Sequence, residues 1–143
     1  MKISRDGIDK LIEWEGCVLH VYNDAAGLPT IGCGHLLHHN ESYPTGITHS
    51  QAIDLLSNDL MRFEDVVNKE VKVPLTQSQY DALVIFAFNI GTGAFRNSTL
   101  LKELNQGKYD EVPEQLSRWT KAGGKKIAGL VNRRNNEIAL WNA

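Results

Sequence analysis

The sequence has few cysteines, no long apolar run and no recognisable leader segment. No stretch approaches the ~20 consecutive apolar residues of a membrane-spanning helix, so we expect no insertion into a membrane. Residues 1–6 lack the apolar core of a secretory signal peptide. Internal repeats and low-complexity linkers are missing too. A length of 143 residues then favours a single domain.

Cys17 and Cys33 are the only two cysteines. We expect both to be small buried hydrophobic side chains with reduced thiols. A disulfide between them is the alternative if the protein reaches an oxidising space, because both flank the same expected hairpin.

Charge is unevenly distributed along the chain, although the net charge is only −2. Residues 115–136 contain six basic residues and no acidic one, whereas the remainder has 9 basic and 17 acidic residues, a net charge of −8. The simpler interpretation of this basic stretch is a solvated face. The alternative is a basic surface that attracts an anionic polymer.

The first part of the chain predicts a helix followed by a hairpin. Apolar residues at offsets i, i+3 and i+4 predict a helix over residues 5–15, with Ser4 as its N-cap and Gly16 as its stop. Residues 17–22 are rich in β-branched and aromatic side chains and predict a strand. The expected continuation is a turn at 23–29, a second strand at 30–34 and a third short strand near 42–46.

Two capping boxes, at 48–51 and 76–79, predict the start of two helices. The first helix should run about 20 residues, long enough to link two lobes. The second is apolar on all sides and should be surrounded by other helices. Shorter helices are expected at 98–106, 110–119 and 130–142, with a loop at 121–129. The fold class is therefore α+β. We expect one domain over 1–143, with a β lobe at about 16–47, a helical lobe at about 70–143 and an N-terminal helix that packs with the helical lobe.

Glu15 and Asp24 are the most informative acidic residues. Glu15 continues the apolar face of its helix at i+7 and directly precedes Gly16. A buried position and a helix C-terminus both favour the protonated form of a carboxyl group, which can give a proton to a leaving group. Asp24 lies in the polar turn 23–27, where we expect a carboxylate. Two acids in opposite environments are typical of a glycoside hydrolase pair.

Thr30 is the third candidate of this group. A straight strand would place Glu15 and Asp24 roughly 30 Å apart, so the chain must reverse near Gly16 for joint chemistry. Asp24 and Thr30 bracket a turn, so together they can hold one water molecule. The alternative for Thr30 is a purely structural role in its strand.

These residues stand in a longer pattern: Glu15-Gly16, Tyr22-Asn23-Asp24, Gly27 and Thr30-Ile31-Gly32-Cys33-Gly34-His35-Leu36-Leu37. The pattern continues at 86–95, 98–101, 117–119 and 129–140. In this order it resembles the phage lysozymes, the endolysins of glycoside hydrolase family 24 that include the T-even and lambdoid enzymes. The resemblance covers nearly the whole chain.

The resemblance implies a lysozyme-like fold, with a small N-terminal β-hairpin lobe and a larger helical lobe joined by a long helix. It implies hydrolysis of the β-1,4 bond between N-acetylmuramic acid and N-acetylglucosamine in peptidoglycan, with inversion at the sugar. Glu15 matches the general acid, and Asp24 and Thr30 match the residues that position water. Substrate-binding positions carry over to Leu36, Phe88, Ser98 and Gln115, and either Arg133 or Arg134 is the expected basic partner of Glu15. No cofactor and no metal are expected.

The resemblance also implies a partner and a location. The partner is the peptidoglycan polysaccharide, with no nucleic acid, and a monomer is the default. The signal-anchor of some lambdoid endolysins is missing, so we expect the protein to wait in the host cytoplasm. It would then reach the periplasmic cell wall through a membrane lesion made by a holin.

Several alternatives stay open. A lytic transglycosylase or a peptidoglycan-binding protein without catalysis are the rival functions. For Phe88, core packing is an equal rival to ligand contact. His35, His38 and His39 suggest a metal cluster, but with no acid or cysteine to complete it we expect loop and core roles. In particular, we expect His35 to tie a strand to a helix, and Trp119 and Trp141 to lie in the core.

Overall fold

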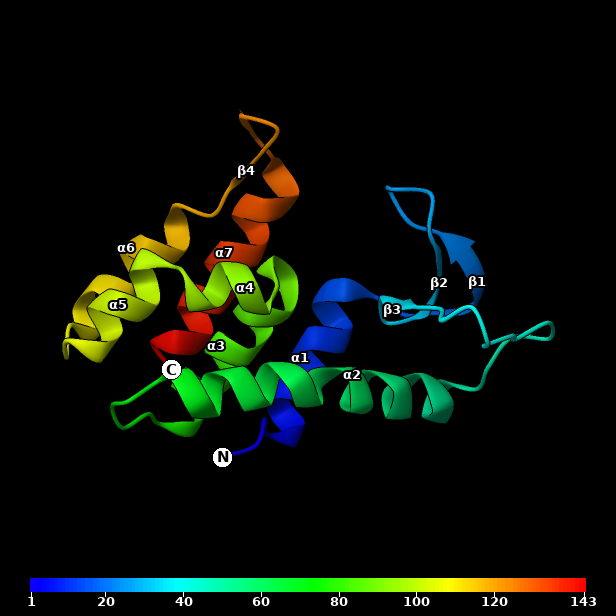
Figure 1. Ribbon diagram of the computed structural model, residues 1–143, viewed down its shortest axis with the longest axis horizontal. Helices are drawn as coiled ribbons and strands as arrows, with labels where there is room; N and C mark the ends of the chain where they lie inside the picture. Colours follow the sequence, from blue (N-terminus) through cyan, green and yellow to red (C-terminus); the bar gives the residue numbers. More distant parts are fainter. The chain divides into compact units, whose positions relative to one another are not determined.

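The computed structural model describes residues 1–143 and divides into two compact units (Figure 1). The β-containing unit is Ile8–Met61, and the helical unit combines Met1–Gly7 with Arg62–Ala143. We describe each unit by itself. No helix combines the length and the apolar character needed to cross a lipid bilayer.

Helix α1 spans Arg5–Glu15, as predicted. The Ser4 hydroxyl accepts a hydrogen bond of 2.9 Å from the Gly7 N–H, which confirms the N-cap. Gly16 ends the helix with φ at +72°, and its N–H donates to the Ile12 carbonyl at 2.8 Å. Only glycine adopts this left-handed conformation without strain, so the chain turns away from the helix axis directly after Glu15.

The β-containing unit holds an antiparallel sheet in the order β1-β2-β3, visible as the three neighbouring strands of Figure 1. Its strands are β1 (Val18–Asn23), β2 (Pro29–Gly32) and β3 (His35–Leu36). The first two strands and their turn confirm the predicted hairpin.

The third strand predicted near 42–46 is wrong, because the chain turns there. The Gly46 N–H donates to the Tyr43 carbonyl at 3.0 Å, and Gly46 has φ at +81°. Pro44 has no N–H to give to a ladder, which also disfavours a strand. The true third strand, β3, is only two residues long.

The expectation of reduced thiols is wrong as well, because Cys17 and Cys33 form a disulfide with their Cα atoms 4.3 Å apart. The bond ties the residue before β1 to the residue after β2. The two cysteines become neighbours because the antiparallel register pairs Val18 with Gly32.

Removal of this disulfide should destabilise the protein. The bond closes a loop with a sequence separation of 16, and a loop of this size stabilises the folded state by about 3 kcal/mol. The double variant Cys17→Ser/Cys33→Ser should therefore lose about 3 kcal/mol of unfolding free energy, measured by urea denaturation. The reduced parent protein is the control and should unfold like the double variant. Equal stability of the double variant and the oxidised parent would contradict the prediction.

Helix α2 (His49–Glu70) begins in the β-containing unit and ends in the helical unit. The Thr48 N–H donates to the Gln51 side chain at 2.7 Å, and the Gln51 N–H donates back to the Thr48 hydroxyl at 3.1 Å. This reciprocal pair confirms the first capping box. The helix is 22 residues long, close to the predicted length.

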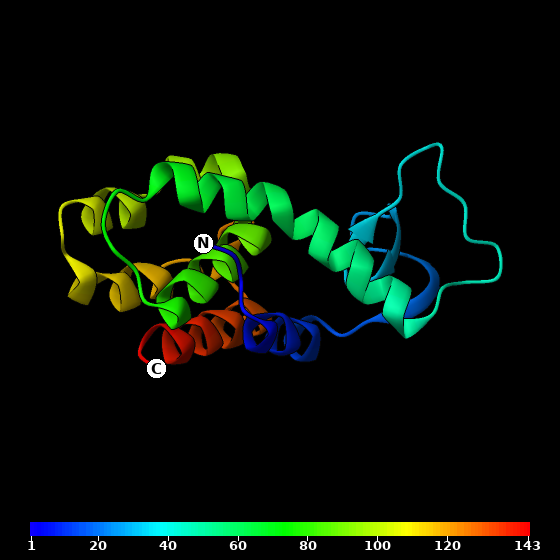
Figure 2. The same cartoon turned by 90° about the horizontal axis from the view of Figure 1, so that it is seen from below.

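The second capping box, Thr76 with Gln79, opens helix α3 (Gln77–Ile90). Every residue of α3 from Tyr80 to Ala87 is buried, as its apolar sequence predicts. Helix α7 (Ala128–Trp141) lies along α3 (Figure 2). The remaining helices are α4 (Thr92–Arg96), α5 (Thr99–Asn105), the 3₁₀ turn η1 (Tyr109–Glu111) and α6 (Val112–Ser117).

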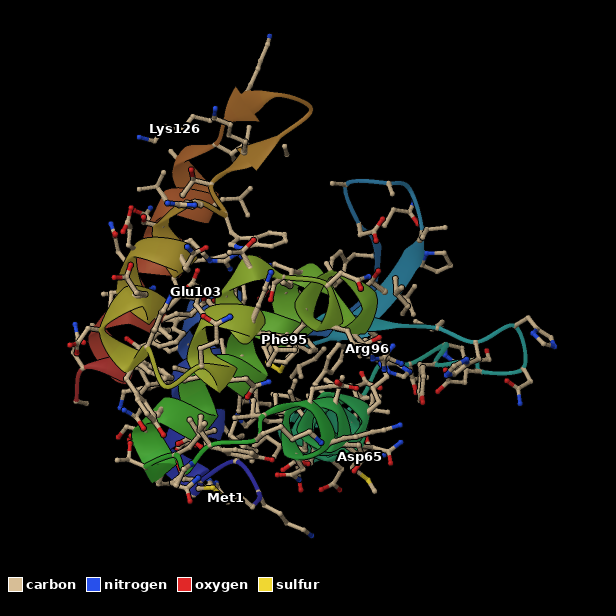
Figure 3. All side chains as sticks on the ribbon, turned by 60° about the vertical axis from the view of Figure 1, so that its left-hand side comes forward. Met1, Asp65, Phe95, Arg96, Glu103 and Lys126 are labelled. Atoms are coloured by element: carbon tan, nitrogen blue, oxygen red, sulfur yellow. A yellow bond between two sulfur atoms is a disulfide. The ribbon has the colours of Figure 1, made fainter.

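Aromatic side chains fill the core of the helical unit. The ring of Phe86 on α3 meets the rings of Phe95 and Trp119 edge to face, at centroid distances of 6.3 and 5.6 Å. Figure 3 labels Phe95 inside this helical unit. Trp141 is 5% exposed and lies in the core as expected, whereas Trp119 is half-buried and contacts the core through Phe86.

The loop predicted at 121–129 contains a small hairpin instead, with strands β4 (Lys121–Ala122) and β5 (Lys125–Lys126). Gly123 and Gly124 both have positive φ, at +59° and +78°, which is typical of a tight hairpin turn. Lys121, Lys125 and Lys126 are all exposed, and Figure 3 shows Lys126 pointing away from the ribbon. This part of the basic stretch is therefore a solvated surface.

Candidate active site

Glu15 is the last residue of α1, and its side chain is half-buried. The reversal at Gly16 leads the chain directly into β1, which carries Asp24 just after its end. The β-containing unit therefore holds all three predicted catalytic residues, Glu15, Asp24 and Thr30.

The Asp24 side chain is held in one orientation by the turn that follows it. Its Oδ1 atom accepts hydrogen bonds from the Ala26 N–H at 2.8 Å and the Leu28 N–H at 2.9 Å. The Asp24 N–H in turn donates to the Leu28 carbonyl at 2.9 Å. Because both turn bonds use Oδ1, the second carboxylate oxygen, Oδ2, is left for other partners.

Thr30 lies on β2 opposite Tyr22 and is only 2% exposed. Its hydroxyl donates to the Leu28 carbonyl at 2.9 Å, the same oxygen that accepts from the Asp24 N–H. The structure thus brings Asp24 and Thr30 to one residue, Leu28. With its hydrogen given to Leu28, the Thr30 oxygen can accept a hydrogen bond but has none to donate.

The four predicted substrate-binding residues lie in different places. Leu36 on β3 is 49% exposed and pairs with Thr30 in the sheet register. Phe88, Ser98 and Gln115 belong to the helical unit.

Phe88 and Ser98 both make contacts within the protein that hold the structure together. The Phe88 ring packs edge to face on Phe63 at 5.4 Å, and the side chain is half-buried. Ser98 is the N-cap of α5, accepting from the Leu101 N–H at 3.1 Å and donating to the Phe95 carbonyl at 2.7 Å. Gln115 is 6% exposed on α6. The binding roles of all three stay predictions.

Arg134, one of the two basic residues expected near Glu15, forms a buried ion pair with Glu137 one helical turn along α7. Arg134 Nε lies 2.8 Å from Glu137 Oε1, and Arg134 Nη2 donates to Glu137 Oε2 at 3.0 Å. Both side chains are at most 2% exposed. Arg134 also donates to the Asn89 side chain at 2.6 Å, which links α7 to the end of α3.

A second polar cluster surrounds His35, outside the three predicted catalytic residues. His35 Nδ1 lies 2.8 Å from Asp59 Oδ2 on α2, which confirms that His35 ties a strand to a helix. Its Nε2 lies 3.0 Å from Glu41 Oε1. Burial lowers the pKa of His35, but the hydrogen bonds and charges of Asp59 and Glu41 outweigh it and raise that pKa above its usual value.

Glu41 is the residue that sequence reasoning missed. Its carboxylate accepts from the His38 backbone N–H at 2.7 Å and from the Tyr43 hydroxyl at 2.9 Å. The His38 hydrogen bond outweighs partial burial, and with the bonds from His35 and Tyr43 it lowers the pKa of Glu41 to about 2. The regular three-residue spacing of His35, His38 and Glu41 was the available signal.

Comparison with known proteins identifies the family. The phage lysozyme family model matches residues 12–137. The chain is 42% identical to the endolysin of Salmonella phage P22, covering 99% of this chain and 98% of the relative. It is also 45% identical to the endolysin of Bacillus phage PZA. That match covers 100% of this chain but only 56% of the longer PZA protein.

Solved structures agree. A mutant of P22 lysozyme superimposes with a TM-score of 0.89 at 40% identity, covering 100% of this chain and 99% of the other. The muramidase domain of SpmX from Asticaccaulis excentricus gives a TM-score of 0.90 at 35% identity, covering 99% and 98%. These matches confirm the predicted α+β, lysozyme-like fold. The chain belongs to the phage lysozyme family, a family of glycoside hydrolases.

Proposed function

We propose that this protein is an endolysin that hydrolyses the β-1,4 bond between N-acetylmuramic acid and N-acetylglucosamine in peptidoglycan. The observation that supports it best is the shared anchoring of Asp24 and Thr30 on Leu28. This anchoring orients an anionic oxygen and a hydroxyl oxygen without consuming Asp24 Oδ2. Membership of the phage lysozyme family supports the same reaction class.

In the proposed reaction, Glu15 gives its proton to the glycosidic oxygen as the bond to the sugar carbon breaks. A water molecule donates hydrogen bonds to Asp24 Oδ2 and to Thr30 Oγ1. Its oxygen attacks the sugar carbon from the opposite ring face, while Asp24 takes one of its protons. This order inverts the configuration of the sugar and calls for the two carboxyl groups to be about 6.5–9.5 Å apart.

The proposal extends to the remaining expectations. Leu36, Phe88, Ser98 and Gln115 contact the glycan, and the two units act as lobes of one lysozyme-like domain. The protein works as a monomer, waits in the host cytoplasm and reaches the periplasmic wall through a holin lesion. The Cys17–Cys33 disulfide supports action in an oxidising space such as the periplasm.

Product analysis tests the reaction. Purified peptidoglycan is digested with the protein, and the released fragments are studied by mass spectrometry and by NMR of the fresh anomeric carbon. We expect hydrolysed muramic acid ends in the inverted configuration. Anhydro sugars would instead show a lytic transglycosylase, and binding without any cleavage would show a non-catalytic protein.

Asp24→Asn should slow the release of fragments by about 10²-fold or more, since the amide cannot take a proton from water. The Asn carbonyl oxygen can still accept from Ala26 and Leu28, so the turn should persist. The clearing rate of chloroform-treated Gram-negative cells measures activity, and circular dichroism checks the fold. A variant that clears cells at the parent rate would remove Asp24 from the mechanism.

A further inference from the structure

The side chains of His35, His38 and Glu41 bring three potential metal ligands together outside the proposed catalytic residues. One ligand atom from each lies within 4.8 Å of the other two. From this geometry we propose that the cluster binds a divalent transition-metal ion, and that zinc is the ion it fits. Two imidazole nitrogens and one carboxylate oxygen, with water as the fourth ligand, are a common donor set for Zn²⁺.

The spacing of the donor atoms suits a tetrahedral ion. Ligand atoms of a zinc site lie about 3.3 Å from one another, given metal–ligand bonds of about 2.0–2.2 Å. His35 Nε2 and Glu41 Oε1 are 3.0 Å apart, and His38 Nε2 is 3.9 Å from the same oxygen. A cation between His35 Nε2 and Glu41 Oε1 would replace the hydrogen atom of the hydrogen bond between them. The His38 side chain is 71% exposed, so it is free to rotate towards the ion.

Asp59 supplies an independent observation in favour of a metal site. Its carboxylate accepts from Nδ1 of His35 at 2.8 Å, which turns Nε2 towards Glu41. Histidines that bind metals almost always donate their second N–H to a carboxylate or a carbonyl in this way. His35 is 5% exposed, so its ring is held in the required orientation before any ion binds.

Two of the three ligands can be reached from solvent, because the His38 side chain is exposed and Glu41 lines an open pocket. An open pocket of about 420 Å³ is lined in part by Glu41, Tyr43 and His20. Cys17 and Cys33 are bonded to each other, so no free thiolate competes for the metal.

A bound ion would restrain the longest segment of the β-containing unit that has no regular secondary structure. Residues 37–48 contain no helix or strand. An ion held by His35 on β3 and by His38 and Glu41 in this segment would pin it to the sheet, and through Asp59 to α2. The ion binds the folded chain and not the unfolded one, because only folding brings these ligands together, so the inferred role is stabilisation.

Calorimetric titration of the chelator-treated full chain with Zn²⁺ tests the site, with Co²⁺ as a spectroscopic probe. We expect one ion per chain, visible bands of four-coordinate cobalt and a higher melting temperature with zinc. His38→Ala removes one exposed ligand and leaves the His35–Asp59 pair intact. This variant should weaken zinc binding at least about tenfold. Even residues that only hydrogen-bond to a metal ligand change metal affinity by about 10–100-fold when they are substituted, and His38 is a direct ligand in the proposed site.

His39→Ala is the matched control, because it removes a neighbouring exposed histidine that is not part of the cluster. It should bind zinc like the parent protein. Absence of zinc binding by the parent protein would overturn the proposal, as would an unchanged affinity in His38→Ala. Zinc affinity and melting temperature are both measured without lytic activity. The metal site can therefore be confirmed if the proposed function fails, and the proposed function can be confirmed if the metal site fails.

Discussion

Glu15→Gln should abolish lysis, with a rate loss of about 10²–10⁴-fold, the usual contribution of a general acid. The amide has nearly the size of the acid but carries no proton to give to the leaving oxygen. Glu15 is the final residue of α1, and Gly16 rather than Glu15 terminates the helix. The substitution should therefore leave the local backbone unchanged, so the loss reports on proton transfer.

The rate is measured as clearing of chloroform-treated Gram-negative cells, and circular dichroism checks the fold. Glu13→Gln is a matched control, because Glu13 lies on the same helix two residues earlier with its side chain exposed. The control should lyse cells like the parent. If purified Glu15→Gln retained the parent rate, Glu15 would not be the acid and the proposed mechanism would fail.

Glu137→Ala should produce the largest loss of stability, about 3–5 kcal/mol. The substitution leaves the guanidinium group of Arg134 without the carboxylate that it meets through two close contacts, at 2.8 and 3.0 Å. Arg134 is 1% exposed, so water is not available to solvate the charge. The cost is the loss of two close contacts to a buried charge, which water cannot replace, and not the attraction of an average exposed ion pair.

Glu114→Ala is the matched control for this stability measurement. Glu114 also meets an arginine on its own helix face, with Arg118 Nη2 at 3.2 Å, but both side chains are at least 60% exposed. An exposed pair of this kind contributes about 0–1 kcal/mol, because water and salt screen it. Urea denaturation of both variants gives the two free energies. Similar losses in both would show that burial does not set the strength of the Arg134–Glu137 pair.

Local sequence signals predicted the helices well. Ser4, Thr48 and Thr76 were identified as starts of helices, and all three accept the expected backbone hydrogen bonds. Gly16 was identified as a stop and has the left-handed backbone of a helix end. These signals act within a few residues, so they can be interpreted without knowing what the helix packs against.

Short strands were predicted less well. The strand expected at 42–46 is a turn, while β3 and the β4–β5 hairpin have strands of two residues each. Two residues are too few for an alternating pattern to show. Their pairing depends on partner strands, which a propensity for extended structure does not identify.

For the candidate site, too, the sequence identified the residues, whereas the strand register set their arrangement. The residue types and their order were sufficient to nominate Glu15, Asp24 and Thr30, and to suggest the family that the comparisons confirm. That Asp24 and Thr30 share Leu28 as an anchor follows from the register of β1 and β2.

The sequence by itself determined where most helices begin and end and the α+β class, because caps, helix stops and apolar periodicity are local. The order of its motifs, through their resemblance to phage lysozymes, was enough to suggest the family. Only the tertiary structure decided that Cys17 bonds to Cys33 and that Glu41 joins His35 and His38. It also decided that Asp59 orients the His35 ring from a different element. These contacts depend on backbone reversals and strand register, which place side chains within bonding distance through the geometry of the whole unit.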